Sequence, residues 1–300
     1  MKTNLLTLFL GIILIFANVV QAKSKVLLRL NLQKGTTYEM TMAMINNMDQ
    51  DMMGKKMKID QKMEMVFSYH VLDVLPNKNF LIEYSMLKMN MKMNVNDKEM
   101  NFDSESHDTI NPMNTLLKGI LANKVKLELS PRGQVAGVEG LEEYVKKISQ
   151  NPLMAKSMQM FADDKNFKSF IGQTFNYFPE SKVAKGDKWS SIFTLPALMN
   201  LETNMNFEVD AIEKDQAILN VLSDINIDAP LDLNGMKFNM KMTGIQNGSI
   251  TIDHNDGWFR LSKLAQNLNM KMNIKNPQNG EDMEIPMLMN SVVKLTVVKK

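Results

Sequence analysis

The chain has 300 residues, of which 44% are hydrophobic and 23% charged, and its 35 basic side chains are nearly balanced by 33 acidic ones. This balance provides no basic surface for nucleic acid or an anionic membrane, so we expect no nucleic-acid partner. Cysteine is absent, which excludes disulfides, thiol chemistry and a lipid-modified cysteine. Methionine occurs 29 times, so it takes over part of the usual role of Leu, Val and Phe.

Residues 1–22 have the pattern of a cleaved signal peptide. Lys2 provides a positive start, residues 5–20 are mostly apolar, and Val20-Gln21-Ala22 has the small-residue spacing of a cleavage site. The apolar run is shorter than the roughly 20 residues that a membrane-spanning helix needs. We therefore expect an exported protein, periplasmic or secreted after cleavage following Ala22, without a transmembrane segment. An uncleaved anchor is the alternative.

Alternation of apolar and polar residues predicts antiparallel strands in the N-terminal part of the chain. In the segment 80–95 the apolar parity changes between Met86 and Leu87, and we predict a β-bulge there that returns the later residues to the same face. Beyond the bulge, SMLKMNMKMN at 85–94 places three methionines on one face and Asn90 and Lys92 on the other. The predicted strand segments are 26–32, 38–44, 63–71 and 80–95.

The middle of the chain changes to helical spacing. Asn111-Pro112 has the form of an N-cap followed by proline at the first helical position. A Ser-Pro-Arg-Gly turn between two short strands follows at 124–139, and strands resume from about residue 173. The predicted helices are 112–122, 140–148, 151–161 and 164–171. We therefore predict a mainly β fold with a central helical group, of class α+β, forming one large curved antiparallel sheet or two related antiparallel modules.

A weak internal repeat favours the two-module alternative. The stretch KGTTY at 34–38 is echoed by KGDKW at 185–189, and each opens a series of strands. This division predicts an N-terminal β module at 23–172, with helices at its C-terminal end, and a C-terminal β module at 173–300. Chance similarity among strands rich in Met, Asn and Lys is the alternative explanation.

Several features together resemble a family of uncharacterised exported proteins of Gram-negative bacteria. They are the signal peptide, KGTTYEM at 34–40, the methionine-alternating strands and LSPRGQVAGVEGLEEY at 129–144. These motifs are structural, so the resemblance implies no reaction, cofactor or catalytic residue. The order of long strands and few helices is also similar to the half-barrel of periplasmic lipoprotein carriers, whose curved sheet holds acyl chains against covering helices. That likeness is one of architecture, and a fold does not determine a function.

The methionines have two chemical interpretations. Met is flexible and polarizable, so at strand spacing on an apolar face it fills a core or lines an adaptable cavity. The candidates for contact with an apolar ligand are Met40, Met42, Met65, Met89 and Met91. Thioether sulfur also selects Cu(I), and a second group lies near Gly54, where we expect a hairpin tip with exposed side chains. The candidates for soft-metal binding or early oxidation are Met48, Met52, Met53 and Met57.

No catalytic group is accompanied by a recognisable partner motif. His70, His107 and His254 lie far apart in the sequence, without a nucleophile elbow, zinc-protease or P-loop pattern. The stretch Asp253–Gly257 is typical of a hairpin turn and lacks the ligand spacing of a calcium loop. We therefore predict a non-enzymatic protein that needs no cofactor and binds a lipid or other apolar small molecule. The alternatives are a Cu(I)-binding or oxidant-buffering protein and a structural envelope protein.

Overall fold

The computed structural model describes residues 25–52, 54–107, 114, 121, 123–149, 164–195, 201–233, 236–275 and 282–300. The predicted signal peptide at 1–22, Met53 and the predicted helix at 151–161 lie outside these residues. Of the helix predicted at 112–122, only Asn114 and Leu121 are described, and both are helical. No helix in the described part of the chain is long and apolar enough to cross a bilayer.

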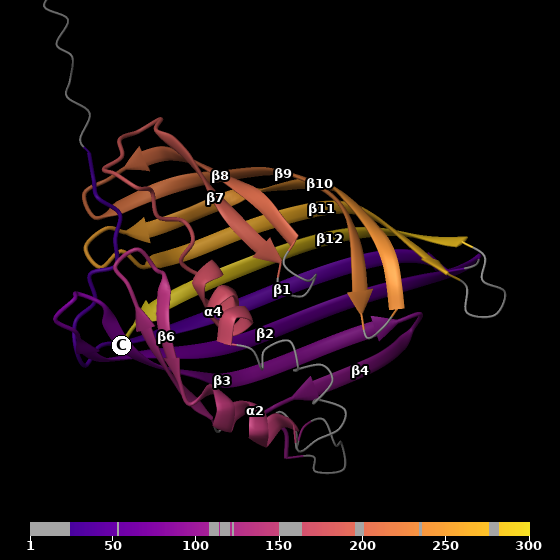
Figure 1. Cartoon of the computed structure of the whole chain (residues 1–300), viewed down its shortest axis with the longest axis horizontal. Helices are drawn as coiled ribbons and strands as arrows, with labels where there is room; N and C mark the ends of the chain where they lie inside the picture. Colours follow the sequence, from indigo (N-terminus) through magenta and orange to yellow (C-terminus); the bar gives the residue numbers. More distant parts are fainter. Residues whose placement is uncertain are drawn as a thin grey trace, which may run out of the picture.

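A single antiparallel sheet of twelve strands organises the described residues (Figure 1). The order across the sheet is β6-β5-β3-β2-β1-β12-β11-β10-β9-β8-β7, and β4 pairs with β3 outside this path. The strands are β1 (Thr37–Met52), β2 (Lys55–Val74), β3 (Phe80–Val95), β4 (Lys98–Asp103), β5 (Lys124–Leu129), β6 (Val135–Glu139), β7 (Lys188–Leu195), β8 (Leu201–Ile212), β9 (Gln216–Leu233), β10 (Met236–Asp253), β11 (Phe259–Lys275) and β12 (Asp282–Lys299).

Pairing of β1 with β12 joins the two ends of the chain into this one sheet. The partners run from Tyr38 with Lys299 to Gln50 with Met287. Strands from both sides of residue 172 therefore share one hydrogen-bonded ladder. That the two sides are related modules stays a prediction.

The predicted α+β class with a central helical group is wrong, because the described fold is essentially all β. Its helices are α2 (Leu141–Ser149) and α4 (Asp164–Gln173), close to the predicted 140–148 and 164–171. They have nine and ten residues, whereas β2 alone has 20. The helical spacing was real, but it belongs to the connection between β6 and β7, the two edge strands of the sheet. These helices therefore lie against the sheet and do not form a layer of their own.

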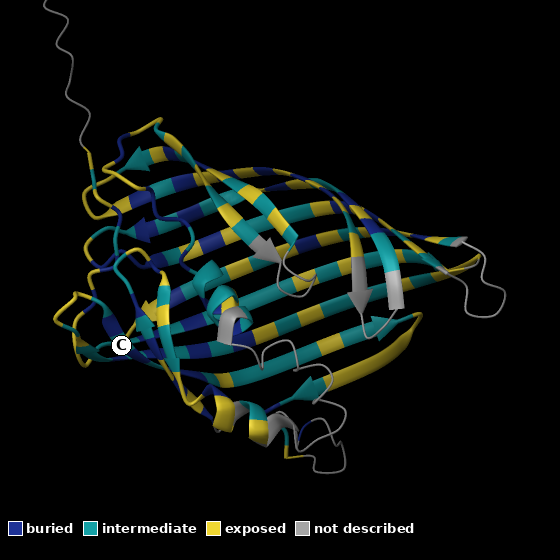
Figure 2. Cartoon of the chain, viewed as in Figure 1, coloured by how far each residue is buried: buried dark blue, intermediate teal, exposed yellow. Residues whose placement is uncertain are grey.

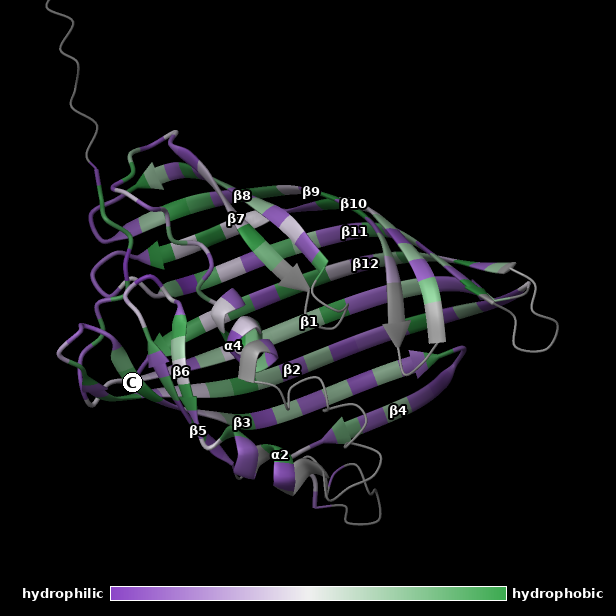
Figure 3. Cartoon of the chain, viewed as in Figure 1, coloured by the Kyte–Doolittle hydropathy of each residue, from purple (hydrophilic) through white to green (hydrophobic). Residues whose placement is uncertain are grey.

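Burial alternates along the strands, as the sequence pattern predicts. Buried and exposed bands follow one another in Figure 2, and hydrophobic and hydrophilic bands do so in Figure 3. The predicted bulge in β3 is confirmed: Met86 pairs with Phe67 and Lys88 with Val66, which leaves Leu87 as the extra residue. Leu87 itself is 47% exposed, so it faces solvent and not the interior. Beyond it, Met89 pairs with Met65 on the inner face.

The inner, concave face carries two apolar clusters. We call the end of the sheet near the 253–257 turn proximal and the end near Gly54 distal. The aromatic core lies at the proximal end, where Tyr38 stacks on Trp258 at 4.4 Å between ring centroids and Tyr69 contacts Trp258 edge-on at 5.2 Å. The methionine cluster lies at the distal end of β9–β12. Its buried members are Ile225, Ile227, Met240, Met242, Leu268, Met270, Ile285 and Met287.

The predicted strand at 26–32 is an extended segment outside the sheet. Val26 forms a single bridge with Val183, while the backbone N–H groups of Leu30 and Asn31 donate to the carbonyls of Pro131 and Asp256 at 2.8 and 2.9 Å. The alternation was right, because Leu28, Leu30 and Leu32 are buried, but it reflects an extended chain that closes the proximal end. The segment passes so close to Gly257, at φ +75°, that a Cβ there would lie 1.8 Å from the Arg29 carbonyl oxygen.

Candidate functional site

Helix α4 lies over the concave face and contacts both edge strands, β6 and β7 (Figure 1). Phe167 and Ile171 point from it into the aromatic core and are 4% and 1% exposed. The Phe167 ring lies 6.4 Å from the ring of Tyr84 on β3. Because one helix contacts both edge strands, it covers the concave face of the sheet. We call α4 together with residues 174–177 the roof.

The segment after α4, the second part of this roof, is bonded to several elements. Phe175 is fully buried and packs edge-on against Tyr69 and Trp258. Asn176 Nδ2 donates to the Ile192 carbonyl on β7, and Tyr177 Oη donates to the Gly257 carbonyl at 3.0 Å. Burial raises the pKa of the Tyr69 and Tyr177 hydroxyls above the ordinary value of 10, so both remain protonated donors at neutral pH.

A cavity of about 240 Å³ lies between this roof and the concave face. Phe170 and Ile171 line it from α4, and no lining residue carries a charged side chain. A site of this kind can enclose an apolar group, because contact with uncharged walls does not strip a charged side chain of its hydration. The sheet contributes, among others, Met40, Met42, Phe67, Tyr84, Phe207 and Leu295.

A row of uncharged polar side chains crosses the concave face between the aromatic core and the methionine cluster. We call it the polar row. Each member faces inward on its strand. Apolar inward residues flank it on the proximal and distal sides, except on β10, where Gly244 and Gly248 flank Gln246. Neighbouring members are register partners on adjacent strands. From β2 to β9 the members are Gln61, Asn46, Ser291, Gln266, Gln246 and Ser223.

Hydrogen bonds connect most of the polar row. Asn46 Nδ2 donates to Gln61 Oε1 at 3.0 Å, and Ser291 Oγ donates to Asn46 Oδ1 at 2.6 Å. Gln266 Nε2 donates to Gln246 Oε1. Gln246 and Gln266 both line the cavity, so the polar row provides its amide groups on β10 and β11.

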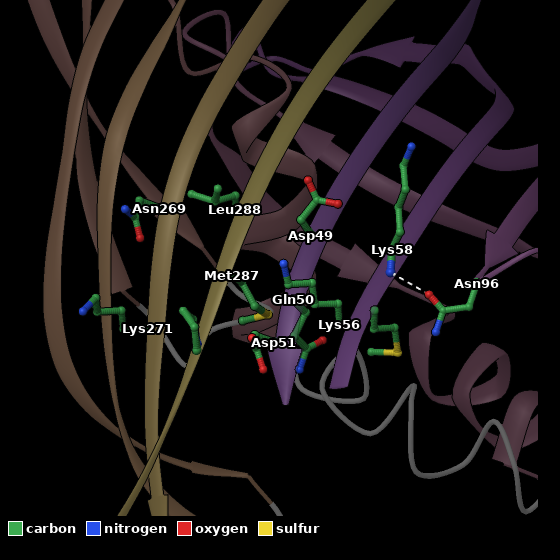
Figure 4. Close-up of a pocket in the computed structure, with 12 residues that line it drawn as sticks. Asp49, Gln50, Asp51, Lys56, Lys58, Asn96, Asn269, Lys271, Met287 and Leu288 are labelled. Carbon is green, nitrogen blue, oxygen red and sulfur yellow. Dashed lines mark hydrogen bonds between the residues drawn. The ribbon is translucent and has the colours of Figure 1, made fainter. Parts of the chain in front are cut away.

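A larger and more open hollow, of about 690 Å³, lies at the distal ends of β1, β2, β11 and β12 (Figure 4). Asp49, Lys56 and Lys271 line it, and the backbone N–H of Lys58 donates to Asn96 Oδ1 at 2.9 Å. Its charged side chains suit a solvated rim and do not enclose an apolar molecule. We therefore take the cavity under α4 as the candidate site.

The structure separates the methionines that the sequence grouped as ligand contacts. Met40 and Met42 line the cavity. Met65 and Met89 pair with each other on β2 and β3. Met91 Sδ accepts a hydrogen bond from Gln61 Nε2 at 3.0 Å. The cavity walls that the sequence reasoning missed are aromatic and amide side chains. A signal was present for Gln266, which stands between the inward residues Leu264 and Leu268, but not for Gln246, which stands between Gly244 and Gly248.

The second methionine group is also dispersed among different environments. Strands β1 and β2 extend to Met52 and from Lys55, so the turn is shorter than predicted. Met48 packs against the methionine cluster, Met57 lines the distal hollow and Met52 is 41% exposed. Among the described residues, no group of three or more His, Cys, Asp or Glu side chains is placed to hold a metal ion.

Two other features that the sequence drew attention to, His70 and the 253–257 turn, have structural partners. His70 Nδ1 bonds with Thr37 Oγ1 at 2.9 Å, and the predicted turn at 253–257 is confirmed. Within it, Arg260 Nη2 donates to Asp253 Oδ2 at 2.9 Å and to Asp256 Oδ2 at 2.6 Å. These contacts stabilise the proximal turn and lie outside the cavity lining.

A family of unknown function, DUF6263, matches residues 77–259. The chain belongs to this family. A search of curated proteins gives no match. Among solved structures, one that describes lipid-protein interactions in lipovitellin is similar, with a TM-score of 0.51 and 9% identity over 90% of this chain. The chain covers 26% of lipovitellin, and the likeness shows the fold alone.

Two other solved structures are similar at lower scores, the first of them an outer membrane channel. A channel from Pseudomonas putida F1 has a TM-score of 0.24 and 8% identity over 90% of this chain and 97% of its own. OccK7 from Pseudomonas aeruginosa has a TM-score of 0.22 and 6% identity over 88% of this chain and 100% of its own. TM-scores this low do not show a shared fold. The fold is a large antiparallel sheet similar to one in lipovitellin.

Proposed function

We propose that the protein is a non-catalytic binder of an apolar molecule, most simply a lipid acyl chain, held between α4 and the concave face. The observation that carries this proposal is the cavity of about 240 Å³, whose walls are mainly apolar and carry no charged side chain. The likeness to lipovitellin supports it at the level of fold.

The size of the cavity supports an occupant. Protein interiors are close-packed and contain few voids larger than a water molecule, whose share of liquid volume is about 30 Å³. The cavity, at about 240 Å³, exceeds that severalfold. It is somewhat smaller than the roughly 300–1,000 Å³ of most small-molecule sites. This volume fits one acyl segment better than a bundle of chains.

Burial of an acyl segment would provide measurable affinity. Each methylene group that leaves water contributes about 0.8 kcal/mol, so five or six enclosed methylenes contribute roughly 4–5 kcal/mol before the cost of immobilisation. Aromatic walls such as Phe67 and Tyr84 add contact area without a large loss of rotamer freedom.

The test is saturable binding of a fluorescent acyl probe to the folded protein. Met42 lines the cavity, so Met42→Trp should fill part of the space and weaken binding by about tenfold or more. Met89→Trp is the matched control, because Met89 is partly buried on the same face but does not line the cavity. An absence of saturable binding by wild-type protein, or equal weakening by both variants, would contradict the proposal.

We also propose that the protein acts after export, in the periplasm or outside the cell. The support is the pattern of residues 1–22. Terminal sequencing of the protein from its host should return Lys23 as the first residue. Recovery of an intact Met1 from the exported form would contradict cleavage.

A further inference from the structure

We infer that Gln246 selects, among apolar ligands, those that carry a neutral oxygen acceptor, such as the carbonyl of an ester or amide. The inference rests on the proposed function and specifies the chemistry of the ligand at the same site. Gln246 would donate a hydrogen bond from Nε2 to that oxygen, while the hydrocarbon part of the ligand lies among the aromatic walls.

Within the described part of the chain, the hydrogen bonds of Gln246 leave its amide nitrogen, which carries two N–H donors, unpaired. Its side chain is 4% exposed, and its Oε1 accepts from Gln266 Nε2. Its Nε2 is buried and has no hydrogen-bond partner among the described residues. Buried amide N–H groups are nearly always paired, because an unpaired one has lost its hydration without compensation. A ligand oxygen would supply the missing acceptor.

The rest of the polar row does not supply this partner. Asn46 is bonded on both sides, by Gln61 and Ser291, and Ser223 Oγ accepts from the Asn206 backbone N–H at 3.3 Å. On β10 itself, the inward positions before and after Gln246 are Gly244 and Gly248. No side chain of the same strand therefore covers the amide.

The absence of charge among the cavity-lining residues determines which acceptor fits. A carboxylate in the cavity would lose its hydration and meet no cationic side chain, because none lines the walls. Arg260 of β11 does not line the cavity, and its Nη2 is bonded to Asp253 and Asp256. An alkane avoids the charge problem but leaves Nε2 unpaired. A neutral ester or amide satisfies both conditions.

The cavity extends from Gln246 to the roof. Gln246 lines it on β10 and Phe170 lines it on α4, with Phe67 and Tyr84 contributed by β2 and β3. A ligand with its carbonyl at Gln246 would therefore direct its hydrocarbon chain towards the aromatic residues under α4.

The test compares three probes of equal carbon number: a fatty-acid methyl ester, an alkane and the free fatty acid at neutral pH. Each displaces a fluorescent acyl probe from the intact mature protein. Wild-type protein should bind the ester about tenfold more tightly than the alkane, equivalent to about 1.4 kcal/mol, and the free acid more weakly than the ester. Gln246→Leu should abolish the advantage of the ester and leave alkane affinity equal or higher.

Gln61→Leu is the matched control, since Gln61 belongs to the polar row but does not line this cavity. It should retain the preference for the ester. Thermal melting checks that each variant is folded, and Gln246→Met replaces Gln246→Leu if the latter does not fold. Equal affinity of wild-type protein for ester and alkane, or a preference that survives loss of the Gln246 amide, overturns the inference and leaves the proposed function standing. Absence of saturable binding of all probes overturns both.

Discussion

Asn46 of β1 accepts a 2.6 Å hydrogen bond from Ser291 of β12, although 245 positions separate the two residues in the chain. The bond lies on the concave face, where β1 and β12 join the N-terminal and C-terminal strands. Asn46 also donates to Gln61 on β2. One asparagine therefore bonds to two other members of the polar row and connects three strands.

Replacement of Asn46 should destabilise the sheet locally. Asn46→Ala would leave the partly buried groups of Gln61 and Ser291 unpaired, and we expect the free energy of unfolding to fall by about 1–2 kcal/mol. Asn47→Ala is the control: its side chain is bonded to Asp60 Oδ1 at 2.6 Å, but on the exposed face. That variant should stay within about 0.5 kcal/mol of wild type. Equal losses in urea unfolding would argue against a stabilising polar row.

A second prediction tests the inward face of β2. Met65 is 8% exposed and lies between Met42 and Met89 on neighbouring strands. Met65→Asp should lower the free energy of unfolding by more than about 2 kcal/mol, because a carboxyl group would be buried without a partner. Lys62→Asp, at an exposed position of the same strand, should change it by less than about 0.5 kcal/mol. Similar denaturation midpoints for both variants would refute the assignment of faces.

Methionine oxidation should follow exposure. Met52 and Met100 are 41% and 39% exposed, whereas Met240 and Met242 are 2% and 3% exposed. Limited treatment with hydrogen peroxide should convert the exposed pair to sulfoxide first, since peroxide must reach the sulfur. Peptide mass spectrometry would show the order, with protein in denaturant as the control in which all four react alike. Early oxidation of Met240 or Met242 in folded protein would contradict their burial.

Acid should weaken the proximal turn through Asp253. Burial alone would raise the pKa of this carboxyl, but the Asn255 N–H and the Arg260 guanidinium stabilise the anion and lower it below the ordinary 3.8. A lowered folded-state pKa means that the contribution to stability is complete above the unfolded-state value and is lost as pH falls through the folded-state value. The difference in unfolding free energy between wild type and Asp253→Asn should therefore be largest near pH 6 and shrink below about pH 4. Parallel pH profiles would disprove this linkage.

Local patterns were sufficient for the strands and their faces. Alternation at 85–94 identified the shared face of Met89, Met91 and Met93, and the parity change at Met86 identified the bulge. These inferences succeed because side-chain direction in a strand depends only on neighbouring residues. The fold class was predicted wrongly because it depends on contacts between segments that are far apart in the chain. Helical spacing at 164–171 predicts a helix, but nothing in it indicates that the helix will contact both edges of one sheet.

The polar row also separates what the sequence shows from what only the folded sheet decides. Asn46 stands between Met44 and Met48, and Gln266 between Leu264 and Leu268, so these interruptions of an inward apolar series are visible in the chain. Gln246 stands between two glycines and carries no such signal. The alignment of the polar-row residues is not visible, because it depends on the register of six strands and on the pairing of β1 with β12. Long-range pairing is decided by the combined burial of the whole concave face, not by any one segment. Only the folded sheet therefore brings the amide of Gln246 and the aromatic residues under α4 to the same cavity.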